Sequence, residues 1–545
     1  MLDTTPRSVV AQWALALALA GCVLLSARAF AAEPHPGLAD RGLRDAPGEL
    51  VRAAPVDAPA WVTPYGLTPA GAVALRWLYG AGDHGLDLTP PAALIHHVAS
   101  PSAASVAAAQ AATSRAVAAL AAALPARPNT DPVLDHPPSG YYLSPDTLWR
   151  GETVAADPSL TAGAFAAARD GRLDTWLTAL LPPHPQYRAL VAAAHRYRAI
   201  CEAGGFPKVQ VVRGRKGSRW RDTDELRRVQ ARLALEGFYP GEPNGAYDDT
   251  MRAAVQRYRR ARVMRPRAWY DADVANALNV PCRDHLARIT LNLRRWRHTA
   301  WTGEPTSVQV NIAGAEVRYH RDGALVSRHR GVVGSGKRSW SRMLKKRVIR
   351  NATPILHDTI DSVILNPEWT VPSRIVRQEL LPKIEADPNY LEEHHYRVKR
   401  SRNGQKMYVQ SHGPHSALGQ VKLAFPNSER IYLHDTNKRG YFRYPKRDFS
   451  HGCVRVKGIV DLAMTIIRDD FARHDKRISR RRLGDILKRN DKPYWFPLDE
   501  PIPVFLEYYT ASVDDDGTLW LHPDIYGYDE ESLAWLEAQG RSAAP

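Results

Sequence analysis

Two short runs in the C-terminal half of the chain carry residues that can do chemistry together. Residues 431–436 read Ile-Tyr-Leu-His-Asp-Thr, and residues 450–455 read Ser-His-Gly-Cys-Val-Arg. A cysteine attacks as a thiolate, and with a free pKa of about 8.5 only a few per cent of it is ionised near neutral pH. A nearby imidazole can accept the thiol proton and later deliver it to a departing amine. The pattern therefore predicts nucleophilic catalysis by Cys453 with a histidine as its base.

Two histidines compete for the role of base. His434 ends a predicted strand, which holds and aims its ring, whereas His451 lies two residues before the thiol and in extended chain shares its face. Asp435 directly follows His434, and strand neighbours point to opposite faces. We therefore expect a backbone carbonyl near Asp435, rather than its carboxylate, to orient the His434 ring.

The residues around the thiol can assist it. Gly452 has no side chain, so a substrate carbonyl can approach the main-chain amides, which can form an oxyanion hole. Arg455 shares a face with Cys453 and can pair with a substrate carboxylate.

The arrangement of these residues resembles the active-site pattern of the L,D-transpeptidases, wall enzymes insensitive to most penicillins. The shared features are the pattern His-x15-Ser-His-Gly-Cys-x-Arg, with the surrounding runs Val310-Asn311-Ile312, Asn366-Pro367-x-Trp369-x-Val371-Pro372 and Ala417-Leu418-Gly419. The resemblance is to the large, multi-domain subgroup that has an attached wall-binding module. It implies Cys453 as nucleophile and His434 as general base. Residues shaping the site or its oxyanion hole are then His451, Gly452, Ser450 and Asp435, and substrate-binding residues are Arg455, Trp369 and Tyr432.

The reaction that this family implies begins at the carbonyl between the third residue of a peptidoglycan stem and a terminal D-alanine. Cys453 forms a thioester, D-alanine leaves, and the side-chain amine of another stem resolves the thioester into a 3→3 cross-link. Water as acceptor gives an L,D-carboxypeptidase, and a free amino acid gives an exchange enzyme. Two further alternatives are a non-catalytic wall-binding protein and a cysteine amidase, although amidases of that type usually place Cys before His.

No cofactor and no metal is expected. The alternative is a zinc site built from His412, His415, His434, His451 and Cys453. The sequence contains no His-Glu-x-x-His motif and no Cys-x-x-Cys pair, so the zinc alternative is not preferred.

The fold class expected is multi-domain α+β. Residues 306–512 alternate in short β-like runs and form the mostly β catalytic domain, with a helical insertion over about 373–412 as a candidate lid. Residues 32–221 form a flexible leader and a helical scaffold, 282–305 a helical connector, and 513–545 a C-terminal segment. Residues 222–281 predict three helices and resemble a small peptidoglycan-binding module, carried by Val229-Gln230, Asn244-Gly245 and Ala254-Val255 among other residues.

The composition and the N-terminal sequence indicate which partners and which cellular compartment to expect. The net charge of +17 favours an anionic partner, but no nucleic-acid motif accompanies it, so the expected partners are peptidoglycan stems and the cell wall. Residues 1–31 read as a signal peptide, which predicts a periplasmic protein. Leu19-Ala20-Gly21-Cys22 also resembles a lipoprotein box, so a membrane tether depends on lipidation of Cys22. Of the other three cysteines, Cys201 and Cys282 can pair, which leaves Cys453 free.

Overall fold

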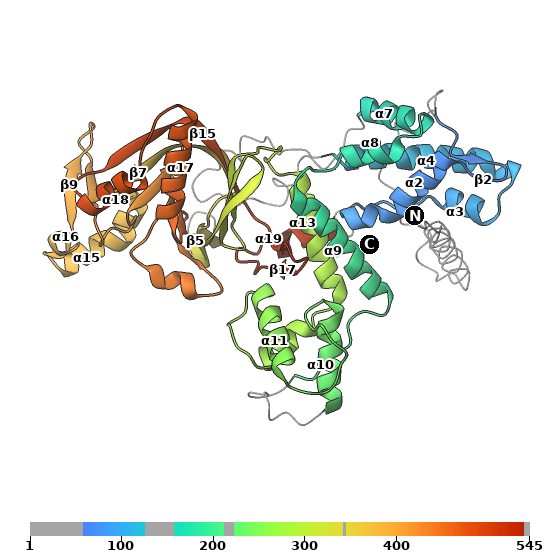
Figure 1. Cartoon of the computed structure of the whole chain (residues 1–545), viewed down its shortest axis with the longest axis horizontal. Helices are drawn as coiled ribbons and strands as arrows, with labels where there is room; N and C mark the ends of the chain where they lie inside the picture. Colours follow the sequence, from blue (N-terminus) through green and yellow to red (C-terminus); the bar gives the residue numbers. More distant parts are fainter. Residues whose placement is uncertain (1–57, 126–156, 212–222, 342–344, 539–545) are drawn as a thin grey trace, which may run out of the picture. The chain divides into compact units, whose positions relative to one another are not determined.

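The computed structural model describes residues 58–125, 157–211, 223–341 and 345–538 (Figure 1). These residues form two compact units. The first unit comprises residues 58–79, 88–122 and 157–178, and the second comprises the rest. The predicted signal peptide, Cys22 and most of the predicted leader lie outside the described residues.

The first unit is a small helical assembly. Trp61 is fully buried in it, and its indole Nε1 donates a hydrogen bond to Ser114 Oγ at 2.9 Å. The helix α4 (Ala103–Ala123) is rich in alanine, the residue with the highest helix propensity. By length and composition it is the one described helix apolar enough to cross a membrane. The elements are β1 (Val62–Thr63), β2 (Gly66–Leu67), α2 (Pro69–Gly80), α3 (Ala92–Ala99), α4 (Ala103–Ala123), α7 (Pro158–Arg169) and α8 (Leu173–Ala179).

Two long helices, α9 (Pro185–Glu202) and α13 (Cys282–Arg297), pack together in the second unit, which also holds the short helix η1 (Ala81–His84). The connector helix α13 begins at Cys282, the first residue of the expected connector, because Pro281 precedes it and the fixed φ of proline suits a helix start. The pairing of Cys201 with Cys282 is confirmed: this disulfide joins the end of α9 to the first residue of α13.

Residues 223–278 form the three predicted helices, α10 (Thr223–Leu235), α11 (Asp249–Ala261) and α12 (Ala272–Leu278). Asp248 caps α11 by accepting a hydrogen bond from Met251 N at 2.9 Å. Gln230 explains the Asn244-Gly245 pair: its amide donates to Asn244 Oδ1 and accepts from Gly245 N, each at 2.8 Å. Gly245 has φ +77°, a conformation that favours glycine at this turn.

A mixed sheet forms the frame of the C-terminal part. Its strand order is β13-β5-β14-β12-β11-β7-β15-β3-β4, with β6 paired to β5. The long strand β5, second in this order, also pairs with β4, the last strand of the order. The strands are β3 (Ser307–Asn311), β4 (Glu316–Arg321), β5 (Ala324–Ser341), β6 (Lys346–Asn351), β7 (Leu356–Leu365), β11 (Val421–Ala424), β12 (Leu433–His434), β13 (Asp448–Ser450), β14 (Val454–Val456) and β15 (Tyr494–Glu507).

The hydrophobic core lies between this sheet and the helices α17 (Ile459–Arg473) and α18 (Arg480–Arg489), which are drawn beside the strands in Figure 1. The apolar stripe of α17 and Leu483 of α18 are buried against inward-facing strand residues such as Leu423 and Val454. This core covers one face of the central strands and leaves the other face to the polar residues described below.

The insertion expected at about 373–412 lies between β7 and β11. It contains β8 (Trp369–Thr370), β9 (Tyr396–Arg400) and β10 (Lys406–Gln410), which pair in the order β8-β10-β9 as a separate small sheet. Between β8 and β9 lie the helical turns α14 (Ser373–Ile375), η2 (Val376–Leu380), α15 (Leu381–Ala386) and α16 (Tyr390–Glu393).

The C-terminal segment is part of the same unit. The hairpin of β16 (Ala511–Val513) and β17 (Leu519–Leu521) crosses the boundary expected at residue 512, and α19 (Tyr528–Ala538) follows it. Gln186 of α9 bonds to both backbone groups of Val513, at 2.6 and 2.9 Å. The hairpin of this segment therefore packs against the long helices α9 and α13 of the second unit.

Removing the disulfide should destabilise the second unit. It closes a loop with a sequence separation of 81 residues around the three-helix module. Replacing both Cys201 and Cys282 by serine removes the cross-link and raises the conformational entropy of the unfolded chain. We therefore expect the free energy of unfolding to fall by about 2–5 kcal/mol. Urea unfolding measures the change, and the reduced wild type is the control. Equal stability of oxidised and reduced protein would contradict this expectation.

Candidate active site

The pairing of three central strands places the site residues on one face of the sheet. Lys422 of β11 pairs with His434 of β12, and His434 pairs with Arg455 of β14. Residues opposite each other in neighbouring strands point to the same face, so these three side chains form a row. Tyr432 and Cys453 lie two residues before His434 and Arg455, and therefore belong to the same face.

The intervening residues point into the core. Leu433, Val454 and Leu423 are fully buried on the side covered by α17. A shift of one residue in this pairing would exchange the two faces, so burial of these apolar side chains fixes the position of the polar ones. The structure thus brings His434 and Cys453 to one face from strands that are separate in sequence.

Cys453 is the one free cysteine among the described residues and is half-buried. Its Sγ lies 3.7 Å from the carbonyl oxygen of Arg430. Burial raises the pKa of the thiol, while hydrogen bonds with Tyr432 and the charges of Lys422 and Arg455 act in the opposite direction. The resting cysteine is therefore a thiol at neutral pH and needs a base.

His434 is suited to act as that base. It is buried, and burial lowers the pKa of its imidazole to about 3, with a further lowering by the nearby charges of Arg455 and Lys422. The ring is thus neutral at pH 7 and able to accept a proton. The backbone of Asp435 is close enough to act in the opposite direction and raise this pKa, although the buried Nδ1 has no partner of good hydrogen-bond geometry among the described residues.

The carboxylate of Asp435 is bonded elsewhere. Oδ2 accepts a hydrogen bond from Gln420 N at 3.1 Å and lies 3.4 Å from a guanidinium nitrogen of Arg439. Gly419 makes this approach possible, because a Cβ there would lie 2.4 Å from Asp435 Oδ2. The carboxylate holds the loop before β11, which agrees with the argument that neighbours on a strand face apart.

Ser450 and Gly452 shape the turn that carries the thiol. The Ser450 hydroxyl donates to the Cys453 carbonyl oxygen at 2.6 Å and accepts from Gly452 N at 3.2 Å. Gly452 has φ +127°, and a Cβ there would lie 3.0 Å from Ile431 Cδ1, so only glycine suits the position. Because the Gly452 amide is bonded to Ser450, it is not free to bind an oxyanion.

Thr353 supports this turn and was not found from the sequence. Its hydroxyl donates to the Gly452 carbonyl oxygen at 2.6 Å and accepts from Gly334 N at 2.8 Å. Its amide donates to the Tyr526 hydroxyl, which in turn donates to the Gly334 carbonyl oxygen, each at 2.9 Å. A single threonine about a hundred residues before the turn carries no pattern that could have indicated this role.

His451 contacts the insertion. Its Nε2 lies 2.7 Å from Oε1 of Glu379, which belongs to η2. The sequence grouped His451 with the residues that shape the site, and the structure shows that its partner is an acidic residue of the insertion, which sequence reasoning did not identify.

Two cations face the site without ion-pair partners among the described residues. Arg455 is largely buried, and its Nε and Nη1 have no hydrogen-bond partner there. The Lys422 ammonium, absent from the sequence prediction, lies 4.1 Å from the centre of the Tyr432 ring. Burial lowers the pKa of both groups. Tyr432 also interacts through its hydroxyl with Cys453 and with Trp369 of β8, so Tyr432 lies next to the thiol and Trp369 lies next to Tyr432.

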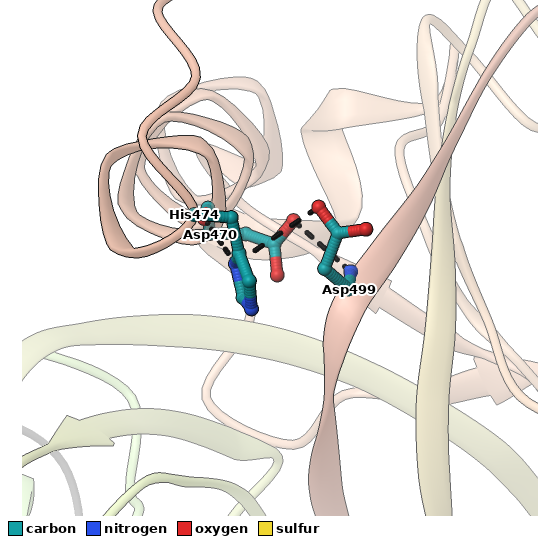
Figure 2. Close-up of side chains that lie close together, drawn as sticks. All are labelled: Asp470, His474 and Asp499. Atoms are coloured by element: carbon teal, nitrogen blue, oxygen red, sulfur yellow. Dashed lines mark hydrogen bonds and ion pairs between the residues drawn. The ribbon is translucent and has the colours of Figure 1, made fainter.

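Among the described residues, one group of side chains is arranged so that it could hold a metal: Asp470, His474 and Asp499 (Figure 2). None of the residues of the zinc alternative belongs to this group. The Asp470 carboxylate accepts from the amides of Asp499 and Glu500 at 3.2 and 3.0 Å, and His474 Nδ1 donates to the Asp470 carbonyl oxygen at 2.9 Å. The Lys476 ammonium pairs with Asp499. These hydrogen bonds join the end of α17 to β15. The three side chains are thus already bonded to one another, to the backbone or to the ammonium of Lys476.

Comparison with known proteins identifies the kinds of domain that the chain resembles. Residues 305–470 match the family model of the L,D-transpeptidase catalytic domain, and residues 54–193 match that of a scaffold domain. A Haemophilus influenzae protein with the name "Putative L,D-transpeptidase" is 32% identical over 237 residues, which are 41% of this chain and 44% of that protein. The chain thus spans less than half the length of this curated relative.

Solved structures of L,D-transpeptidases match at lower sequence identity. The enzyme from Xylanimonas cellulosilytica is 15% identical with a TM-score of 0.18, over 55% of this chain and 98% of that one. The enzyme from Mycobacterium smegmatis is 11% identical with a TM-score of 0.18, over 37% and 58%. These similarities are too low to carry an argument, and the assignment rests on the family match and the curated relative. Residues 305–470 therefore match the family of L,D-transpeptidase catalytic domains.

The protonation states can be tested through the pH dependence of thiol alkylation. Because burial raises the pKa of Cys453 and His434 is neutral above about pH 3, we expect the iodoacetamide rate at Cys453 to rise through a single midpoint above that of an ordinary cysteine. Mass spectrometry of the peptide that contains Cys453 measures the rate. Fast alkylation already at pH 5–6 would indicate a thiolate–imidazolium pair and contradict the neutral resting site.

The support from Thr353 can be tested by Thr353→Val, which keeps the shape and removes the hydroxyl. The amide of Gly334 and the carbonyl of Gly452 then lose their buried partner, so we expect a loss of about 1–3 kcal/mol in the free energy of unfolding. We also expect slower reaction of Cys453, because its turn is no longer held. Thr359→Val, at a half-buried strand position, is the matched control. Equal losses of stability and of Cys453 reactivity in the two variants would contradict a supporting role for Thr353.

Proposed function

We propose that this protein is a cysteine-dependent L,D-transpeptidase that forms 3→3 cross-links between peptidoglycan stems. The observation that carries the proposal is the shared sheet face of a neutral thiol, Cys453, and a neutral buried imidazole, His434. Next to them lies Arg455, whose Nε and Nη1 have no hydrogen-bond partner among the described residues. A transpeptidase needs these three functions: a nucleophile, a proton carrier and a group that binds the anionic end of a stem.

In the first half-reaction Sγ of Cys453 attacks the carbonyl carbon of the third stem residue, and its proton passes to His434. We assign acceptance to Nε2, because Nδ1 is buried. The bond from this carbon to the nitrogen of D-alanine breaks, the proton moves from His434 to that nitrogen, and D-alanine leaves. A thioester on Cys453 remains.

In the second half-reaction an amine of another stem attacks the thioester. Its proton passes through His434 to the departing sulfur, so the free thiol is restored and a new amide bond is formed. Water or a free amino acid can resolve the same thioester, which would give the carboxypeptidase or exchange reaction instead.

The oxyanion of each half-reaction needs a donor. Because the Gly452 amide is bonded to Ser450, we assign this role to the amide of Cys453 itself. We assign Arg455 to the terminal carboxylate of D-alanine, and Tyr432 with Trp369 to contacts along the stem.

The rest of the chain fits a wall enzyme. The insertion of residues 369–410 reaches the active-site turn through Glu379 and His451, as a lid over the cleft would. Residues 223–278 are proposed as a peptidoglycan-binding module, and the net charge of +17 suits an anionic wall. The proposed location is the periplasm.

The test uses defined tetrapeptide stems and mass spectrometry. The wild type should show the mass of the acyl group on Cys453, release D-alanine and yield a 3→3 dimer, whereas Cys453→Ala should show none of these. His434→Gln should slow acylation by about 10²–10⁴-fold. His96→Gln, an exposed histidine of α3, is the matched control and should leave the rate unchanged.

Each other outcome identifies a different function. Full activity of Cys453→Ala would overturn the thiol mechanism, and loss of activity with a chelator, restored by zinc, would favour a metal enzyme. Binding to the cell wall without formation of any acyl-enzyme would indicate a non-catalytic wall-binding protein.

A further inference from the structure

A cleft lies in the second unit where strands β3, β4 and β15 of the mixed sheet meet the long helices α9 and α13 and the hairpin strand β16. It holds about 540 Å³ of space, part of which is open to solvent. Among the described residues that line it, none belongs to the active site. Clefts of this size commonly bind small molecules or single groups of larger ones.

Aromatic rings form the apolar walls of this cleft. The ring of Trp296 stacks on those of His184 and Tyr509, with ring centres 4.1 and 4.2 Å apart and interplanar angles of 25° and 6°. The ring of Trp301 stands at 81° to that of His184, with the centres 4.7 Å apart. These contacts hold the rings in place, so the cleft offers flat, preformed apolar surfaces. The aromatic side chains that line it are His184, Trp296, Trp301, Phe505 and Tyr509.

Two polar groups of the cleft keep unused hydrogen-bonding capacity. The indole Nε1 of Trp301 is buried and has no hydrogen-bond partner among the described residues. Glu507 is partly buried, and its Oε1 accepts from the Thr299 hydroxyl at 2.9 Å and from Ala300 N at 3.4 Å. Burial raises the pKa of its carboxyl to about 7, and no described cation pairs with it. The cleft therefore has a free N–H donor and a free carboxyl oxygen, Oε2.

The charges around the cleft limit which ligands fit. His184 is neutral at pH 7, because burial lowers its pKa to about 4, and Arg318 is paired with Glu316 at 2.5 Å. The cleft thus offers no unpaired cation among the described residues to an anionic ligand. A free ammonium group would satisfy Glu507 but could accept nothing from the N–H of Trp301. An acetamido group has an N–H for Glu507, a carbonyl oxygen for Trp301 and a methyl group for the aromatic walls.

We propose that this cleft binds an N-acetylated sugar of a polysaccharide chain. The acetamido N–H donates to Oε2 of Glu507, the acetamido oxygen accepts from Nε1 of Trp301, and the apolar face of the sugar ring lies against the aromatic walls. The inference goes beyond the proposed function, because it involves neither Cys453 nor acylation. It assigns to the chain a sugar site separate from the three-helix module.

The experiment measures binding of three disaccharides to the full chain by calorimetry: the dimers of N-acetylglucosamine, of glucosamine and of glucose. Ligand-observed saturation-transfer NMR reports whether the acetyl methyl group is in contact with the protein. The variants are Trp301→Phe, which keeps a ring and removes the N–H, and Glu507→Gln, which keeps an Oε1 acceptor for Thr299 and Ala300. Thermal melting verifies that each variant is folded.

We expect the wild type to bind the acetylated disaccharide at least about tenfold more tightly than either other one, the size of one or two hydrogen bonds. Trp301→Phe and Glu507→Gln should each weaken this binding by about five- to tenfold. Two matched controls should bind as the wild type does: Trp340→Phe, at an exposed tryptophan of β5, and Glu500→Gln, at an exposed glutamate of β15.

Three results would overturn the proposal. One is a wild type that binds none of the disaccharides, or binds them equally. Another is tighter binding of the glucosamine dimer, which would make the cleft a site for ammonium groups. The third is unchanged binding in both Trp301→Phe and Glu507→Gln, which would place the sugar elsewhere on the chain. Cys453→Ala should bind the sugar as the wild type does, so failure of the proposed catalysis would leave this test intact.

Discussion

The catalytic face depends on the parallel pairing of two very short strands, β12 and β14. Leu433 and Val454 pair on the side that faces α17, and both are fully buried. Because side chains alternate along a strand, burying these two residues turns His434, Arg455, Tyr432 and Cys453 to the opposite face. The chemistry of the site thus follows from an ordinary packing constraint beneath it. The pairing of β11 adds Lys422 to the row by the same rule.

Burial has opposite effects on the groups of this face, and together these effects define the resting state. The pKa of Cys453 is raised and that of His434 is lowered, so both are neutral before substrate binds. Lys422 and Arg455 keep positive charges that no described carboxylate pairs with. The site therefore presents an uncharged thiol and an uncharged imidazole beside two cations, and the anionic substrate of the proposed reaction would complement these charges.

The turn that carries Cys453 is held from three distant parts of the chain. Thr353 fixes the carbonyl of Gly452, Tyr526 of the C-terminal segment fixes Thr353 and Gly334, and Glu379 of the insertion bonds to His451. Hydrogen bonds of this kind position reacting groups without touching the substrate. They also explain why residues beyond 512 are integral to the catalytic part of the protein.

The sequence by itself determined the chemistry-bearing residues, the three-helix module and the helical character of the N-terminal part, because these depend on local patterns: Cys453 in Ser-His-Gly-Cys, Gln230 with Asn244-Gly245, and alanine runs. It also indicated through strand alternation that the Asp435 carboxylate faces away from His434. Only the tertiary structure revealed Lys422, Thr353, Glu379 and the bonded state of the Gly452 amide. Lysine, threonine and glutamate are common on any surface, and their roles arise from strand register and long-range hydrogen bonds, which no local pattern encodes.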